Sequence, residues 1–251
     1  MFLRAPGRWE AAALTDEAVR RFREASEATG LVGRCFAHAP YLLNLASYET
    51  ELRRRSIAAL ADELQRAGRL GLAGVVLHPG SARGGSRRAA EVRCRAALAM
   101  AIELAGEGAA PLLLEGSAGS GGQLGRTPEE LVRLLPRGSS LPIGVCLDLA
   151  HLWACGYDLL DDGWEVVLAE LASTWGKAVP DLLHGNDTNV DLGSRRDRHA
   201  PPGEGKLGER FFRALLADGR TGELPIVVEI PPGKSNELVA SALDRLRSWR
   251  Q

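Results

Sequence analysis

The chain of 251 residues has a hydrophobic fraction of 45%, a charged fraction of 25% and a formal net charge of −1. These values are typical of a globular protein, and the balanced charge argues against non-specific nucleic-acid binding by the whole surface. No apolar run approaches the roughly 20 residues of a membrane span, and the N-terminal segment lacks the pattern of a signal peptide. The four cysteines form no CxxC motif. We therefore expect a cytoplasmic protein that does not bind membranes.

Short apolar segments with strand character alternate along the chain with amphipathic segments of helical period. After a short strand stub at 1–6, strands are predicted at 33–39, 72–80, 111–117, 142–151, 181–187 and 225–231. Two of the intervening helices have recognisable starts. Thr15 caps a helix that stops at Gly30, and Thr127 is followed by Pro128 and by Glu130, which completes a capping box.

Continuously apolar strands separated by helices predict a parallel sheet covered by helices. The number of repeats favours a TIM (β/α) barrel, with a doubly wound open sheet as the alternative. No linker or change of composition divides the chain. We therefore predict a single domain over residues 1–251.

Polar side chains suited to metal binding stand at the carboxyl ends of the predicted strands. They are His38, His78, Glu115, Asp148 with His151, His184 with Asp187, and Glu229. In a parallel barrel these ends meet on one face, where active sites of this fold lie. For Asp187 we favour a simpler role, as a cap of the following turn.

A basic loop at 193–208 follows the strand that ends at His184, and it contains Asp197 and His199. Five imidazoles and four carboxylates are too many for the four positions around one zinc ion, so a multinuclear zinc or manganese cluster is predicted. Such clusters polarise a phosphoryl oxygen and lower the pKa of bound water, as phosphodiester hydrolysis requires. Arg195, Arg196 and Arg198 are expected to contact the phosphates that flank the cleaved bond.

Several longer motifs occur in a fixed order. They are HAPYLLNLAS (38–47), HPGS (78–81), LEGSAGSGGQLG (114–125), GVCLDLAHLWACGYDL (144–159), HGND (184–187), GSRRDRH (193–199) with GEGKLG (203–208), and PIVVEIP (225–231). Together they resemble the endonuclease IV family of apurinic/apyrimidinic (AP) endonucleases. The resemblance covers the chain from near residue 1 to about residue 231.

This resemblance implies a xylose-isomerase-like TIM barrel that holds three zinc ions, with Mn²⁺ as an alternative metal. The implied ligands are His38, His78 and Glu115 for one zinc, Glu115 with Asp148, His184 and Glu229 for the second, and His151, Asp197 and His199 for the third. Glu115 and Glu229 are the implied catalytic carboxylates. The implied enzyme is a zinc-dependent deoxyribonuclease IV of base excision repair. It would cut double-stranded DNA 5′ to an abasic site and leave 3′-hydroxyl and 5′-deoxyribose phosphate ends.

The resemblance also implies contacts with DNA. Tyr41 and Leu42 match the residues that the family inserts into the duplex at the abasic gap. In the segment PGRW (6–9), Gly7 stands where the family has a DNA-contacting arginine, and Arg8 is displaced by one position. We include Arg8 among the expected DNA-binding residues.

The opening strand and helix of the family have no match at the start of this chain, so we expect a barrel that lacks its first β/α unit. A start of the gene product further upstream is the favoured explanation, and a monomer is then expected. Self-association or an open barrel are the alternatives. Two other functions stay open: a metal-dependent sugar isomerase or epimerase on a related barrel, and a truncated non-catalytic barrel that binds DNA.

Overall fold

The computed structural model describes residues 1–139, 141–230 and 236–250. Pro231, the last residue of the strand predicted at 225–231, lies outside them. The chain forms two compact units. The first comprises Met1–Glu115 and Arg133–Gly144, and the second comprises Gly116–Val132 and Val145–Gln251. Within the described residues, every helix is too short or too polar to span a membrane.

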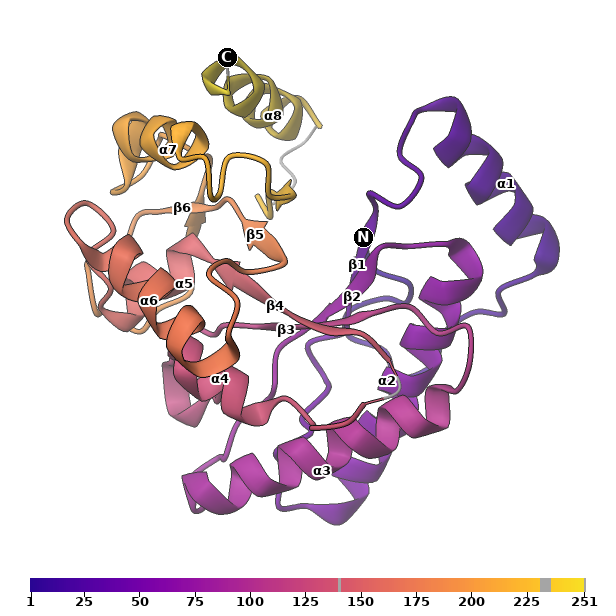
Figure 1. Ribbon diagram of the computed structural model, residues 1–251. Helices are drawn as coiled ribbons and strands as arrows, with labels where there is room; N and C mark the ends of the chain where they lie inside the picture. Colours follow the sequence, from indigo (N-terminus) through magenta and orange to yellow (C-terminus); the bar gives the residue numbers. More distant parts are fainter. Residues whose placement is uncertain (140, 231–235, 251) are drawn as a thin grey trace. The chain divides into compact units, whose positions relative to one another are not determined.

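Three parallel strands in the order β1-β2-β3 form the sheet of the first unit. They are β1 (Phe36–His38), β2 (Gly74–Leu77) and β3 (Leu112–Glu115), and they alternate with α1 (Asp16–Ala28), α2 (Thr50–Leu70) and α3 (Arg87–Ala105). The helices α2 and α3 pack against each other (Figure 1). All residues of β2 and β3 are buried, as their continuous apolar sequences predict.

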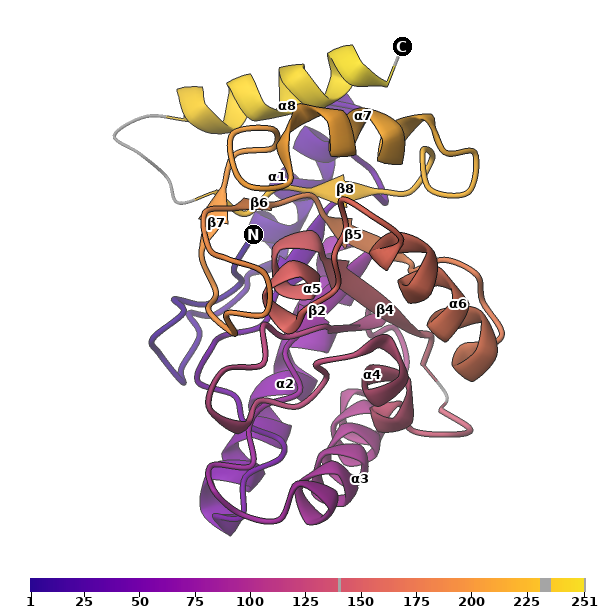
Figure 2. The ribbon, with the colours of Figure 1, turned by 90° about the vertical axis from the view of Figure 1, so that its left-hand side faces the viewer.

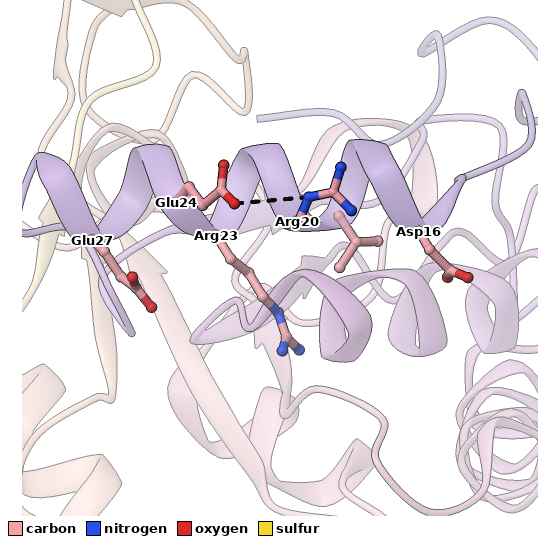
Figure 3. A pocket seen from close by; sticks show the side chains of 6 residues that line it. Asp16, Arg20, Arg23, Glu24 and Glu27 are labelled. Atoms are coloured by element: carbon pink, nitrogen blue, oxygen red, sulfur yellow. Dashed lines mark ion pairs between the residues drawn. The ribbon is translucent and has the colours of Figure 1, made fainter.

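Helix α1 begins where the sequence predicts, because Thr15 Oγ1 accepts a hydrogen bond of 3.2 Å from the backbone of Ala18. Charged side chains line a shallow depression on its surface, and Arg20 pairs with Glu24 at 3.8 Å (Figure 3). Alternating charges of this kind are typical of a solvent-exposed helix face.

The strand predicted at 1–6 does not form, although one residue of it pairs with β1. The nitrogen of Met1 donates to the carbonyl of Phe36 at 2.9 Å, and the carbonyl of Met1 accepts from the nitrogen of His38 at 2.8 Å. The chain then turns, with the nitrogen of Arg8 bonded to the carbonyl of Ala5 at 2.9 Å. The chain bends at residues 3 and 4 and turns at 6 and 7, so it does not continue alongside β1.

The buried side chain of Arg4 fixes the same segment to α2. Its guanidinium pairs with Glu63 and with Asp62, and it donates to the carbonyls of Ala59 and Trp9. Burial raises the pKa of Glu63, and the ion pair with Arg4 opposes that rise. Arg4 therefore neutralises a carboxylate that has no access to water.

We expect Arg4→Met to lower the free energy of unfolding by about 3–5 kcal/mol, because it leaves the buried Glu63 without its counter-charge. Urea denaturation measures the change. Arg54→Met is the control, since Arg54 pairs with Glu51 at 2.8 Å on an exposed helix face. That variant should unfold like the wild type. Equal stability of all three proteins would contradict the assignment of Arg4 as the anchor.

The second unit contains parallel strands in the order β4-β5-β8 and a separate antiparallel pair, β6 and β7. The strands are β4 (Ile143–Asp148), β5 (Leu182–His184), β6 (Asp187–Thr188), β7 (His199–Ala200) and β8 (Ile226–Val227). The helices are α4 (Pro128–Leu134), α5 (Leu149–Cys155), α6 (Gly163–Trp175), α7 (Gly208–Ala217) and α8 (Glu237–Trp249), with a 3-10 turn η1 (Ser120–Gly122). Helices α7 and α8 pack side by side (Figure 2), and the rings of Phe212 and Trp249 stack between them with centroids 6.2 Å apart.

Two sequence expectations for this unit differ in outcome. The capping box before α4 is confirmed: Thr127 Oγ1 accepts from the nitrogen of Glu130 at 3.1 Å, and the Glu130 carboxylate accepts from the nitrogen of Arg126 at 2.9 Å. The strand predicted at 142–151 is too long, because Asp148 ends it by capping α5. The Asp148 carboxylate accepts from the nitrogen of His151 at 3.1 Å, so His151 lies in the first turn of a helix.

Candidate metal centre

Three of the predicted ligands meet at the carboxyl ends of the strands in the first unit. His38 ends β1, His78 follows β2 and Glu115 ends β3. Oε2 of Glu115 lies 3.1 Å from Nε2 of His38 and 3.4 Å from Nε2 of His78. Glu115 is fully buried. A buried carboxylate between two imidazoles fits the requirement that such a charge be paired or bound to a metal.

In the second unit, Asp148, His184 and Glu229 form another set, with ligand atoms within 4.8 Å of one another. Asp148 and His184 are direct partners in the register of β4 and β5, which brings the two side chains together. Nδ1 of His184 lies 3.1 Å from Oε2 of Glu229 and 3.8 Å from Oδ2 of Asp148. Asp148 is fully buried.

His151, Asp197 and His199 form a third set in the same unit. The carboxylate of Asp197 lies 3.4 Å from Nε2 of His151 and 3.2 Å from Nε2 of His199. Nε2 of His199 is also 3.4 Å from Oδ2 of Asp148. Asp148 therefore faces histidines of both sets in this unit.

The orientation of the histidine rings tests whether these groups suit a metal. His38, His151 and His199 each bond through Nδ1 to a backbone carbonyl, of Ala39 at 2.7 Å, Gly116 at 2.8 Å and Glu229 at 3.0 Å respectively. A carbonyl only accepts, so Nδ1 carries the hydrogen and the neutral ring presents the Nε2 lone pair. Each Nε2 faces a carboxylate oxygen. Because the nitrogen and the oxygen both present lone pairs, they attract each other only when a proton or a cation lies between them. A histidine whose other nitrogen donates to a carbonyl is the usual arrangement for a metal ligand.

The charges around Asp197 and His199 agree with this geometry. When a proton rather than a metal lies on Nε2, His151 and His199 donate to Asp197, and these hydrogen bonds hold the pKa of Asp197 well below its usual range. Burial alone would lower the pKa of His199, but the carboxylates of Asp148 and Asp197 outweigh burial and raise it to about 9. This part of the site therefore favours positive charge, which a bound cation would supply.

Asn186 was not among the residues singled out from the sequence, yet it links two predicted ligands. Its amide nitrogen donates to Oδ2 of Asp148 at 2.6 Å, and its side-chain oxygen accepts from the nitrogen of Glu229 at 2.7 Å. Asn186 is fully buried. The HGND motif contains this residue, but its partners lie 38 and 43 positions away in the chain. The contacts become visible only in the folded unit.

Asp187 is a cap, as the sequence suggests, but of a more distant segment than the following turn. Its carboxylate accepts backbone hydrogen bonds of 2.9–3.1 Å from Gly203, Gly205, Leu207 and Gly208. A Cβ on Gly205 would lie 2.4 Å from Oδ1 of Asp187, so only glycine fits there. The pairing of β6 with β7 places His199 opposite Thr188. Asp187 therefore secures the loop that carries Asp197 and His199.

Residues 1–249 match the family described as "Xylose isomerase-like TIM barrel". A "Probable endonuclease 4" of Chloroflexus aurantiacus is 37% identical over all of this chain and 88% of its own length, and one of Oleidesulfovibrio alaskensis is 43% identical over 79% of this chain and 68% of its own. The crystal structure of endonuclease IV from Thermus thermophilus superposes with a TM-score of 0.84 at 36% identity, over 99% of this chain and 87% of that one. The chain belongs to the endonuclease IV family.

Membership of the endonuclease IV family confirms the predicted α/β class, the TIM-barrel fold and the identification of the chain as an endonuclease. Both units contain parallel strands and helices between them in the chain, which agrees with this fold. Among the described residues, groups that could hold a metal ion include His38 with His78 and Glu115 in the first unit, and Asp148 with His151 and His199 in the second.

The residues that the endonuclease IV resemblance assigns to DNA contact lie on loops. Tyr41 and Leu42 follow β1, and the Tyr41 side chain is 65% exposed while Leu42 is half-buried. Arg8 is exposed beside the turn at Pro6. The exposed arginines of the loop between β6 and β7 are Arg195, Arg196 and Arg198. Arg195 has a left-handed backbone with φ of 55°, and its nitrogen bonds to the carbonyl of Ala154 at 2.9 Å.

We expect Asp187→Ala to free the backbone donors of the 203–208 loop and to lower the free energy of unfolding by about 3 kcal/mol or more, because unsatisfied buried donors are costly. Hydrogen exchange followed by mass spectrometry should show faster exchange of this loop. Asp158→Ala is the control, since the Asp158 carboxylate accepts an exposed hydrogen bond of 3.2 Å from the backbone nitrogen of Leu160. Unchanged exchange of 203–208 in the Asp187 variant would show that another contact holds the loop.

Proposed function

We propose that this endonuclease hydrolyses the phosphodiester 5′ to an abasic site in double-stranded DNA, leaving 3′-hydroxyl and 5′-deoxyribose phosphate ends. The proposed role is base excision repair in the cytoplasm. The observation that carries the proposal is the orientation of His38, His151 and His199, each of which donates to a carbonyl and presents Nε2 to a carboxylate. Relatives named endonuclease 4 at 35–43% identity support the reaction class.

We infer that three zinc ions bind, with Mn²⁺ as a substitute. The ligands are His38, His78 and Glu115 for the first ion, Glu115, Asp148, His184 and Glu229 for the second, and His151, Asp197 and His199 for the third. The five imidazoles favour zinc over magnesium or calcium, which prefer oxygen ligands. When bound, clustered zinc polarises a phosphoryl oxygen and activates water for attack.

The remaining roles belong to side chains of the chain itself. Glu115 and Glu229 are the proposed catalytic carboxylates, with Asn186 as the positioning residue for Glu229 through its bond of 2.7 Å to that backbone nitrogen. Tyr41 and Leu42 fill the gap left by the missing base. Phosphates of the DNA backbone are contacted by Arg8, Arg195, Arg196 and Arg198, which are exposed.

Two other functions fit less well. A sugar isomerase or epimerase on a related barrel uses one or two metals, whereas His151, Asp197 and His199 form a further set. Three exposed arginines beside that set suit a phosphodiester better than an uncharged sugar. A non-catalytic DNA-binding barrel would not need to keep all nine ligands. We further propose that residues 1–251 act as one barrel domain and as a monomer, with self-association if the barrel is open.

Elemental analysis of protein purified without chelator should return close to three zinc equivalents per chain, because the ligands form three sets of nitrogen and oxygen donors. The double variant Asp197→Ala with His199→Ala should lose about one equivalent and keep the others. A single metal per chain in the wild type would contradict the trinuclear assignment.

Glu229→Gln should reduce nicking of an abasic duplex by at least about 100-fold, since loss of a partner behind a metal ligand already costs 10- to 100-fold. The fold should survive, because Glu229 lies just beyond the end of β8 and is only part-buried. Circular dichroism checks the fold, and Glu223→Gln, at an exposed carboxylate, is the matched control. A Glu229 variant that cleaves at the wild-type rate would make this carboxylate purely structural.

A further inference from the structure

We propose that Phe2 is a further substrate-contacting residue, which forms with Tyr41 an aromatic platform for a base that flanks the abasic gap. This inference rests on the proposed function and adds a residue to the substrate site. Phe2 was not singled out from the sequence, where it reads as part of a strand stub. Its place in the first unit gives it a different role.

Two aromatic rings, those of Phe2 and Tyr41, contact the ring of the predicted ligand His38. The ring of Phe2 lies 5.6 Å from that of His38 and 5.6 Å from that of Tyr41, and the ring of Tyr41 lies 5.4 Å from His38. The planes of Phe2 and Tyr41 meet at 63°, an edge-to-face pair. The aromatic pair is therefore in direct contact with a residue of the candidate metal centre.

Both members of this pair are open to solvent. Phe2 is 40% exposed and Tyr41 is 65% exposed. A single exposed apolar side chain needs no explanation, but two adjacent aromatic rings beside a polar site are typical of a binding surface. Here both rings contact His38, which itself lies against His78 and Glu115, so a fitting ligand has both a flat apolar face and a group that suits a metal site.

A nucleotide has both features. When its phosphate lies at the ligand set of His38, its sugar and base reach the neighbouring rings. A base beside the gap has lost one stacking neighbour, and an aromatic side chain can stack on the exposed face of any base, because every base has a π face. An enzyme that recognises a missing base must accept any base beside the gap. Stacking allows this, because it does not depend on the hydrogen-bonding groups that distinguish one base from another.

The position of Phe2 is fixed before any ligand binds. On one side of it, the main chain of Met1 bonds to Phe36 and His38 of β1. On the other side, Arg4 is held by Glu63 and Asp62 of α2. Binding therefore does not have to order this segment, and the stacking energy is not lost to ordering.

The test compares Phe2→Leu, which keeps an apolar side chain, with Phe2→Tyr, which keeps the ring. In steady-state nicking of an abasic duplex, we expect Phe2→Leu to raise KM by about 5- to 150-fold, the equivalent of 1–3 kcal/mol of stacking per base. We expect kcat to change by less than about threefold, since the metal ligands are intact. Phe2→Tyr should keep both constants near the wild-type values. Val32→Ala, at an exposed apolar residue of the same unit, is the control.

A second readout follows stacking directly. With 2-aminopurine placed beside a tetrahydrofuran abasic analogue, on either flank in turn, the wild type and Phe2→Tyr should quench the probe, whereas Phe2→Leu should not. Zinc content and melting temperature should be equal in all variants. Equal KM and equal quenching in Phe2→Leu would overturn the proposal, as would loss of zinc in Phe2→Leu, which would make the ring a support for His38 only.

The same experiment separates the inference from the proposed function. A wild-type protein that binds the abasic duplex without cutting it would overturn the proposed reaction, and the quenching comparison would still decide the role of Phe2. A wild type that does not bind the abasic duplex would overturn both.

Discussion

The second unit depends on one buried carboxylate, that of Asp148. Its two oxygens cap helix α5 through the nitrogen of His151, accept a hydrogen bond from Asn186 and face the ring nitrogens of His184 and His199. A fully buried charge with these neighbours is costly unless a cation or a proton accompanies it. The same group therefore ends a strand, starts a helix and creates the demand for metal. Stability and chemistry are coupled at this position, so a change at Asp148 would affect both.

Glu115 sets the same constraint in the first unit, where Nε2 of His38 and Nε2 of His78 approach one of its oxygens. In both units the parallel strands deliver the ligands, because their carboxyl ends lie side by side at one edge of each sheet. Backbone carbonyls then orient the rings of His38 and His151 through hydrogen bonds to Nδ1, so no other side chain is needed for this orientation. The loop between β6 and β7 carries Asp197. Asp187 of β6 accepts four backbone hydrogen bonds from 203–208 and so fixes the segment that follows His199.

Residues 1–9 show how a segment with little regular structure can serve the site. One residue pairs with β1, one arginine is buried against α2, and the ring of Trp9 lies 4.3 Å from the guanidinium of Arg55. Between these anchors Phe2 reaches His38 and Tyr41. The contacts that hold the segment come from α2 and β1, and Phe2 itself remains 40% exposed.

The sequence by itself determined the strands that end in ligands, the caps at Thr15 and Thr127, and the family, because apolar periodicity, capping chemistry and the motifs around His38, His184 and His199 are local patterns. It did not determine that residues 1–6 turn away from β1, that Asp148 starts a helix, or that Asn186, Asp187 and Phe2 support or line the site. Those outcomes depend on partners such as Glu63, Glu229, Gly205 and Tyr41. These partners are distant in the chain or lie outside the recognised patterns. Only tertiary packing decides which partner a buried polar group or an exposed ring contacts.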